Sequence, residues 1–180
     1  DLKNKSAEEV LDQYISTFNA TSLSERQTHL STRIKMTDGI VKEAVQAYQN
    51  YNNELLSINN EWINACKEAN NVLGFNCGNT NDLTIIYEKS TILSKEIVEE
   101  VDIVKINVQS KIVSGTTSED TVESIQEVTY FLKKQGNEWK IFDVLNDQGR
   151  LSTIGVESFK KSFDDEIVEY RNLLKDFKDA

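Results

Sequence analysis

Few residues of this sequence have the types and the spacing that catalysis requires. The single histidine, His29, stands on the polar side of an expected short helix, and no nucleophile-elbow pattern accompanies it. A Ser-His-Asp arrangement therefore cannot be drawn. The seven glycines are scattered and form no phosphate-binding loop. We expect no catalytic residue and no cofactor.

The carboxylates gather at residues 96–102 and 164–166, but neither run has the ligand spacing of an EF-hand. A solvated face is the simpler interpretation, so we expect no metal site. Asp143 is a separate case, because it is predicted to face the same side of an expected strand as Trp139 and Ile141. On a concave face it would be a buried acid with a raised pKa, and on a convex face it would be solvated.

Cys66 and Cys77 are the only cysteines, and the segment between them contains Gly74 and several asparagines. That composition is typical of a helix end and a turn, which would bring the two sulfur atoms together. In an oxidising compartment the pair would form a disulfide; two separate buried thiols are the alternative. The chain begins at Asp1 without methionine, and residues 1–5 (Asp-Leu-Lys-Asn-Lys) are mostly polar. We therefore expect an extracytoplasmic protein that is secreted or held at a membrane by a preceding anchor.

The composition limits the classes of partner. The 180 residues are 38% hydrophobic and 28% charged, which fits one domain with a sizeable core. A net charge of −10 would repel phosphate backbones, and the lysine pairs 133–134 and 160–161 are too small to form a basic patch. We therefore expect no nucleic-acid partner. No apolar run approaches the roughly 18 residues that a membrane span needs.

Three helices are predicted in the first part of the chain. Residues 6–9 (Ser-Ala-Glu-Glu) and 22–25 (Ser-Leu-Ser-Glu) match the capping box that opens a helix. From residue 41 to 72 apolar residues recur at spacings of three and four, which predicts one long helix with a weak point in the asparagines near residues 50–53. We expect its apolar stripe to belong to the core; coiled-coil pairing between copies, which would make the helix an oligomerising stalk, is the alternative.

After residue 78 the apolar period changes from 3.6 to 2, which predicts an antiparallel sheet. The turn at residues 135–137 predicts a hairpin, and a last helix carries an apolar stripe from Phe159 to Phe177. Strands are predicted at residues 83–87, 97–113, 122–134 and 138–145. We thus expect a single α+β domain over residues 1–180. Its expected parts are a polar tether (1–5), a helical part (6–72), an antiparallel sheet (83–146) and a C-terminal helix (156–178).

The sequence of the last predicted hairpin is similar to that of a known superfamily. Residues 128–144 read Val-Thr-Tyr-Phe-Leu-Lys-Lys-Gln-Gly-Asn-Glu-Trp-Lys-Ile-Phe-Asp-Val. This resembles the closing hairpin of the NTF2-like superfamily, in which an aromatic-flanked strand, a glycine turn and a Trp-Lys-Ile strand recur. It is similar in particular to the extracytoplasmic NTF2-like domains of Gram-positive bacteria. The resemblance implies a curved antiparallel sheet that wraps around the long helix as a cone, with the C-terminal helix as an addition.

The resemblance also implies what a site would contain. Enzymes of the superfamily, such as ketosteroid isomerases, place a tyrosine and acidic residues inside the cone. Tyr14 and Asp38 would then be oxyanion donor and base, but core packing for Tyr14 and helix capping for Asp38 are the simpler roles. We therefore expect a non-catalytic interaction or scaffold domain, monomeric or homodimeric, whose partner is a protein or a cell-envelope component.

The alternative hypothesis is a small-molecule-binding or enzymatic domain with a pocket in the cone. An open cavity that holds Tyr14 or Asp143 beside a second polar group would favour this alternative. A space filled by packed side chains would favour the scaffold. The candidate pocket residues are Tyr14, Tyr48, Trp62, Tyr130 and Asp143.

Overall fold

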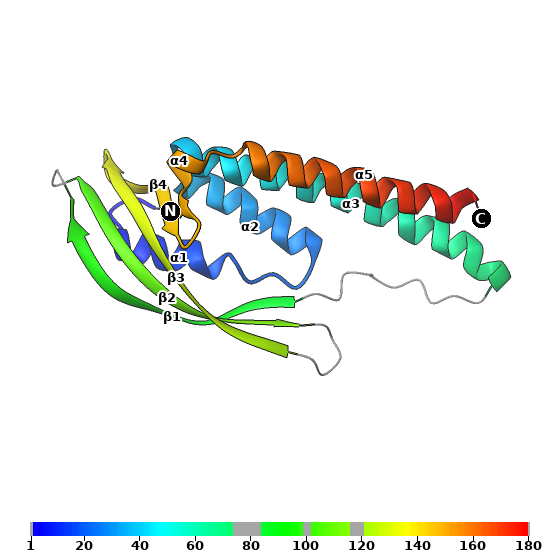
Figure 1. Cartoon of the computed structure of the whole chain (residues 1–180), viewed down its shortest axis with the longest axis horizontal. Coiled ribbons are helices and arrows are strands. Elements are labelled where there is room, and N and C mark those ends of the chain that lie inside the picture. Colours follow the sequence, from blue (N-terminus) through cyan, green and yellow to red (C-terminus); the bar gives the residue numbers. More distant parts are fainter. Residues whose placement is uncertain (1, 74–83, 99–101, 116–120, 180) are drawn as a thin grey trace.

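The computed structural model describes residues 2–73, 84–98, 102–115 and 121–179, and Figure 1 shows its elements in the predicted order. The chain is α+β, as predicted, with helices before and after an antiparallel sheet. Among the described residues no helix is long and apolar enough to cross a bilayer. The helices are α1 (Ala7–Ser16), α2 (Leu23–Met36), α3 (Gly39–Leu73), α4 (Leu151–Ile154) and α5 (Glu157–Asp179). The strands are β1 (Thr84–Ile97), β2 (Ile103–Gly115), β3 (Thr121–Gln135), β4 (Glu138–Asn146) and β5 (Gly149–Arg150).

Side-chain caps start the first two helices. The Ser6 hydroxyl accepts a hydrogen bond from the Glu9 backbone N–H, and the Glu9 carboxylate accepts one from the Ser6 N–H, which completes a capping box. Ser22 accepts a hydrogen bond from the Glu25 backbone in the same way, but the Glu25 carboxylate bonds to Thr21 instead of Ser22. Both predicted helix starts are therefore confirmed, and the second has only half of the box.

The long helix α3 runs through its asparagine-rich stretch without a break. Asn52 is fully buried there and donates from Nδ2 to the Leu23 carbonyl at 2.9 Å and to Gln27 Oε1 at 2.8 Å. Its Oδ1 accepts a hydrogen bond from Arg26 Nε at 2.6 Å. Asparagine weakens a helix because its side chain competes for the backbone, and here that side chain is already committed to α2. Asn52, in the stretch predicted to weaken the helix, therefore connects α3 to α2 through these hydrogen bonds.

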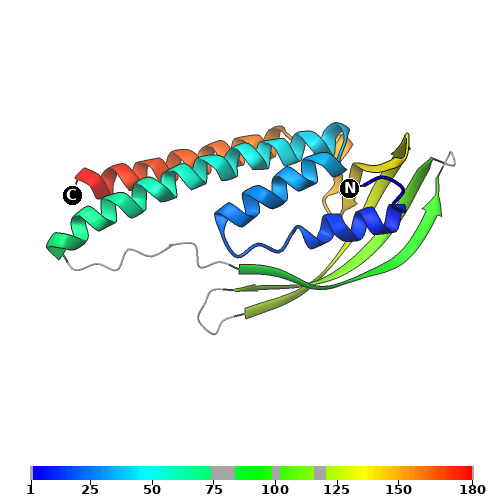
Figure 2. The same ribbon diagram turned by 180° about the vertical axis from the view of Figure 1, so that it is seen from behind.

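The sheet is antiparallel throughout, with the strand order β1-β2-β3-β4-β5. It curves around α1, and α2 and α3 lie beyond α1 on the same side (Figures 1 and 2). Alternate residues of β2, β3 and β4 point to this concave side and form one core with the helices. The strands contribute Val104, Ile106, Val108, Val128, Tyr130, Leu132 and Ile141, and the helices contribute Val10, Leu11, Tyr14, Leu30, Met36, Val41 and Val45.

The first strand differs from its prediction. β1 continues to Ile97 instead of ending near residue 87, and β2 begins only at Ile103. Two register shifts interrupt β1, at Glu88 and at Leu93, and most of its side chains are exposed. An edge strand with bulges and solvated side chains shows no apolar alternation, so its period is hidden in the sequence.

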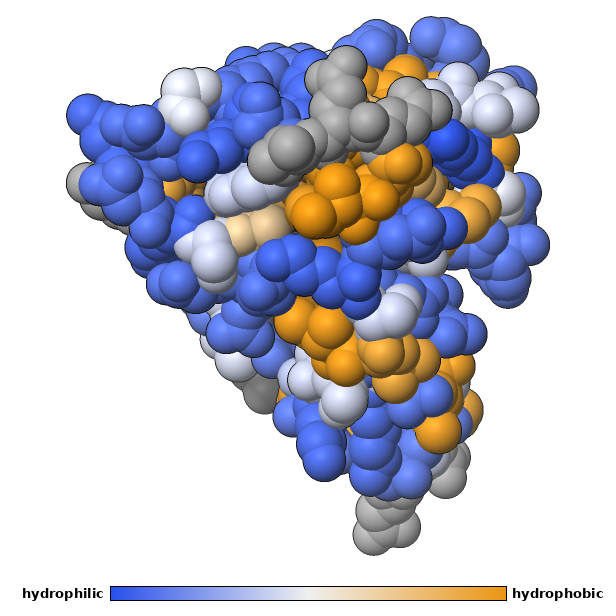
Figure 3. Space-filling view, turned by 90° about the vertical axis from the view of Figure 1, so that its left-hand side faces the viewer, coloured by the Kyte–Doolittle hydropathy of each residue, from blue (hydrophilic) through white to orange (hydrophobic). Residues whose placement is uncertain are grey.

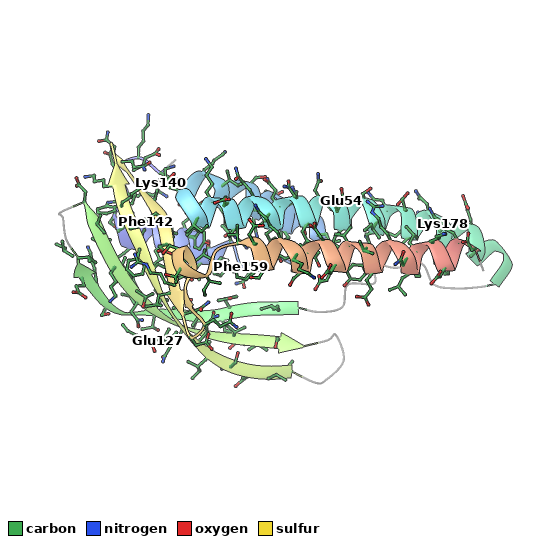
Figure 4. All side chains as sticks on the ribbon, turned by 45° about the horizontal axis from the view of Figure 1, so that its top comes forward. Glu54, Glu127, Lys140, Phe142, Phe159 and Lys178 are labelled. Carbon is green, nitrogen blue, oxygen red and sulfur yellow. The ribbon has the colours of Figure 1, made fainter. Side chains whose placement is uncertain are left out.

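Helix α5 lies alongside α3, and the two project together away from the sheet, with the C-terminus at their far end (Figures 1 and 2). We call them the helix pair. The ring of Tyr51 stacks on Phe163 with centroids 4.5 Å apart, and near the far end Trp62 contacts Phe177 at the same separation. Figure 4 labels Glu54 and Lys178 along the pair. The apolar stripe of α3 is therefore covered partly by the domain core and partly by α5 of the same chain.

Candidate functional site

A cavity of about 270 Å³ opens to the surface where the helix pair meets the sheet. Its wall comes from α1, α2, the first turns of α3, the β4–β5 turn, α4 and the start of α5. Phe159, on this wall, is labelled in Figure 4 where α5 leaves the sheet. Most of the wall is apolar, and its polar members include one arginine and two tyrosines. The lining residues used below are Tyr14, Arg33, Ala44, Val45, Tyr48, Ile154 and Phe159.

Among the described residues that line this cavity Arg33 is the only charged one, and we therefore call the space the Arg33 cavity. Its Nε donates to Thr17 Oγ1 and its Nη2 to the Thr17 carbonyl, both at 2.8 Å. The guanidinium also lies 4.7 Å from the ring centre of Phe18. The two hydrogen bonds use only two of the five N–H donors. Within the described part of the chain no carboxylate pairs with Arg33.

Burial lowers the pKa of the Arg33 guanidinium, since the charged form loses solvation there. An arginine side chain nevertheless remains charged at any physiological pH. Removing a charge from water without a counter-ion is unfavourable. Arg33 is thus a partly desolvated cation that a bound anion would stabilise.

Two tyrosines, Tyr14 and Tyr48, also line the Arg33 cavity. Burial raises the pKa of the Tyr14 phenol, although the Arg33 charge opposes the shift, so the phenol stays neutral and can donate a hydrogen bond. Among the described residues neither hydroxyl has a hydrogen-bond partner. Both hydroxyls are therefore free to bind a ligand.

Tyr130 lies next to Tyr14 in the core, with ring centroids 6.0 Å apart in an edge-to-face arrangement. Its burial raises the pKa of its phenol well above the ordinary value. The structure thus places three of the five predicted pocket residues together: Tyr14 and Tyr48 in the cavity wall, and Tyr130 behind Tyr14.

Asp143 does not share a face with Ile141, so this part of the strand prediction is wrong. In the register of β3 and β4, Leu132 lies opposite Ile141 and Phe131 lies opposite Asp143, while Phe142 is skipped. Directly opposed residues of an antiparallel pair point to the same side of the sheet. The bulge at Phe142 therefore turns Asp143 to the side away from the core, since one extra residue reverses the alternation.

Asp143 is nevertheless only 2% exposed, because the chain after β4 folds over it. Its carboxylate accepts hydrogen bonds from Arg150 Nε at 2.6 Å, from the Val144 N–H at 2.9 Å and from the Ser152 N–H at 3.0 Å. Burial alone would raise the pKa of Asp143, but the hydrogen bonds from Ser152, Arg150 and Val144 outweigh burial and lower it. Asp143 is thus an ionised anchor that ties β5 and α4 to the sheet, and it is unsuited to act as a general acid.

The remaining predicted residues lie away from the Arg33 cavity. Trp62 is on the helix pair, about 21 Å along α3 from Tyr48 at 1.5 Å per residue, where it packs on Phe177. Cys66 is buried on α3, and Cys77 lies outside the described residues, so their disulfide stays a prediction.

Asp38 does not join Tyr14 in a catalytic pair. Its carboxylate pairs with Lys133 at 3.0 Å and accepts a hydrogen bond from Gln135 at 2.9 Å, and chiefly the Lys133 contact lowers its pKa. It is not among the residues that line the Arg33 cavity. In the described part of the chain no group of three or more His, Cys, Asp or Glu side chains is placed to hold a metal ion.

The sequence prediction missed Arg33. A signal was available, because Arg33 follows Leu30 by three residues and therefore lies on the inward face of α2. Arg26 lies on the same face seven residues earlier. A charged residue on the inward face of a short helix indicates either a structural hydrogen bond or a ligand-binding site. Arg33 donates hydrogen bonds to Thr17 and also lines an open cavity.

Comparisons with known proteins identify no family. No protein-family model and no curated protein matches the chain. Among solved structures, a phospholipid-binding protein from Ralstonia solanacearum in complex with a phospholipid is similar over 96% of this chain and 92% of that chain. The sequence identity is 15% and the TM-score is 0.32, a likeness too weak to support an argument about fold or ligand. The resemblance to the NTF2-like superfamily therefore stays a prediction.

Proposed function

We propose that this chain is a non-catalytic, extracytoplasmic binding domain and that a small apolar ligand occupies the Arg33 cavity. The observation that carries this proposal is the open cavity itself, with Tyr14 and Arg33 together in its wall. A mostly apolar wall with a few convergent polar groups is the usual character of a small-molecule site. The space corresponds to about nine water molecules at ~30 Å³ each, which suits a ligand of roughly ten non-hydrogen atoms.

The absence of catalysis is part of the same proposal. The two acids that sequence reasoning considered, Asp38 and Asp143, are both held ionised by partners outside the cavity. In the part of the chain that the structure describes, no aspartate, glutamate, histidine or cysteine lines the cavity. The wall therefore offers hydrogen-bond donors and apolar surface, which suffice for binding.

A thermal-shift screen with small apolar compounds tests the proposal. A ligand at 100 times its Kd stabilises the folded state by about 2.7 kcal/mol, so the Tm of the protein should rise. Ala44→Phe should abolish that rise, because Ala44 lines the cavity and a phenyl ring there would occupy it. Gln46→Phe, on the exposed face of α3, is the control and should keep the rise. A Tm that no compound moves, at saturating concentration, would remove the support for a pocket.

The second candidate function is an interaction or scaffold domain that presents the sheet to a protein partner or a cell-envelope component. Its support is the apolar surface that the helices leave uncovered: β1, at the edge of the sheet, exposes 44–60% of Ile92, Leu93 and Ile97. Figure 3, which views the molecule from the left-hand side of Figure 1, shows apolar patches between hydrophilic residues. Exposed edge strands are sites at which another strand can pair.

Sedimentation velocity tests the homodimeric form of this second candidate. Pairing of two β1 strands would give a concentration-dependent dimer, which Leu93→Lys should disrupt by placing a charge at the edge. A strict monomer at high concentration would exclude the homodimer and leave only a different partner for this edge.

A further inference from the structure

The charge distribution around the Arg33 cavity is opposite to that of the whole chain. The chain has 30 acidic and 20 basic residues and a net charge of −10. No acidic residue of the described part of the chain lines the cavity, whereas the basic Arg33 does. In a protein this acidic, a cavity with a positive charge and no carboxylate in its wall would select an anion.

A second arginine lies near the same site. Arg26 donates from Nε to Asn52 Oδ1, and its guanidinium carbon is 5.2 Å from the ring centre of Tyr48. It has no ion pair among the described residues. The Arg33 guanidinium is close enough to Arg26, Tyr14 and Tyr48 to interact with each of them electrostatically. Arg33, Tyr14 and Tyr48 thus line the cavity, and Arg26 lies behind Tyr48 outside its wall.

We propose that the ligand is a monocarboxylate with a small apolar body, whose carboxylate binds the Arg33 guanidinium inside the cavity. This inference rests on the proposed function, since it names the class of ligand for the same cavity. The tyrosine hydroxyls of Tyr14 and Tyr48 donate hydrogen bonds to the carboxylate, and the apolar body lies against Val45 and Phe159. One arginine in the wall balances one negative charge, which favours a carboxylate over a doubly charged phosphate ester.

Three probes with the same alkyl chain test separately whether the cavity binds a ligand and whether it prefers a carboxylate. Octanoate, 1-octanol and octylamine each have about ten non-hydrogen atoms, which matches the volume of the cavity. Isothermal titration or NMR titration of the full chain gives the three Kd values. We expect octanoate to bind at least tenfold more tightly than the alcohol, because it alone pairs with Arg33, and the amine to bind most weakly.

Charge-removing variants on one helix test the role of Arg33. Arg33→Met keeps the apolar stem and should reduce octanoate binding to the level of 1-octanol, while 1-octanol binding stays unchanged. Lys35→Met removes the same charge from the exposed face of α2 and should leave all three Kd values as they are. If Arg33→Met does not fold, Tyr48→Phe replaces it, because it removes one hydroxyl donor and no volume. Tyr48→Phe should weaken octanoate several-fold and leave 1-octanol unaffected.

The outcomes distinguish the two proposals. Equal affinity for all three probes, abolished by Ala44→Phe, would overturn the monocarboxylate inference and leave the proposed function intact. No binding of any probe up to its solubility limit would overturn both. Preference for octanoate that survives both Arg33→Met and Tyr48→Phe would place the anion elsewhere on the protein and contradict the inference.

Discussion

At the scale of single residues, the buried charge of Asp143 and the partly buried charge of Arg33 have opposite surroundings. The Asp143 carboxylate receives three hydrogen bonds, one of them from a cation, and lies outside the cavity. Among the described residues Arg33 donates hydrogen bonds only to the uncharged Thr17, and it lines the cavity. A buried charge with a full set of partners organises the chain around it, whereas a charge without a counter-ion has capacity for a ligand. This contrast is the reason that we assign structure to Asp143 and binding to Arg33.

Asp143→Asn should destabilise the fold at neutral pH by about 1–3 kcal/mol, because the amide keeps the shape but loses the charge-assisted bond from Arg150. The folded-state pKa of Asp143 is lowered, so its contribution is present above the unfolded pKa of about 3.9 and is lost as the pH falls through the folded pKa. Urea unfolding at pH 7 and at pH 3 measures this. A difference between wild type and variant that is as large at pH 3 as at pH 7 would contradict the assignment.

At the scale of elements, the Arg33 cavity depends on how α2 is held against α3. Asn52 forms that connection through its hydrogen bonds with Leu23, Arg26 and Gln27. Arg33 lies near the other end of α2 and lines the cavity. The hydrogen bonds of Asn52 to the first turns of α2 therefore help to fix the position of Arg33. Helix α5 completes the wall with Phe159 and Phe163.

Asn52→Ala should lower the free energy of unfolding by about 2–3 kcal/mol, because it leaves the Leu23 carbonyl and the Arg26 donor without their buried partner. Asn53→Ala is the matched control: its side chain is exposed, and alanine is the better helix former, so stability should stay the same or rise slightly. Chemical denaturation followed by circular dichroism measures both variants. Equal effects at the two positions would mean that Asn52 does not link the helices.

At the scale of the whole molecule, the sequence predicts the features that have a strong local period. The apolar spacing predicted α3 and α5, and the Gln-Gly-Asn turn predicted the β3–β4 hairpin. It could not predict β1 beyond residue 87, since that edge strand has no buried face to impose alternation. It could not predict the side of the sheet on which Asp143 lies, because a single bulge at Phe142 reverses the alternation of side chains between the two faces. Local patterns could not predict the Arg33 cavity, because its wall combines residues that are far apart in the sequence, from Tyr14 to Phe163.

The extracytoplasmic part of the proposal concerns the molecule as a whole. We expect Cys66 and Cys77, the two cysteines of the sequence, to be joined in protein isolated from an oxidising compartment. Mass spectrometry after alkylation without reduction should then find neither cysteine labelled, even in denaturant. Alkylation of both cysteines under those conditions would contradict the disulfide and weaken the assigned location.

The central question is whether a carboxylate occupies the Arg33 cavity. Intermolecular nuclear Overhauser effects between octanoate and the labelled protein measure this. We predict contacts from the chain methyl group to Phe159 and Ile154, and from the protons beside the carboxylate to Tyr48 and Arg33. Contacts confined to the exposed side chains of β1, such as Ile92 and Leu93, would show that the ligand binds the sheet edge and would contradict the account.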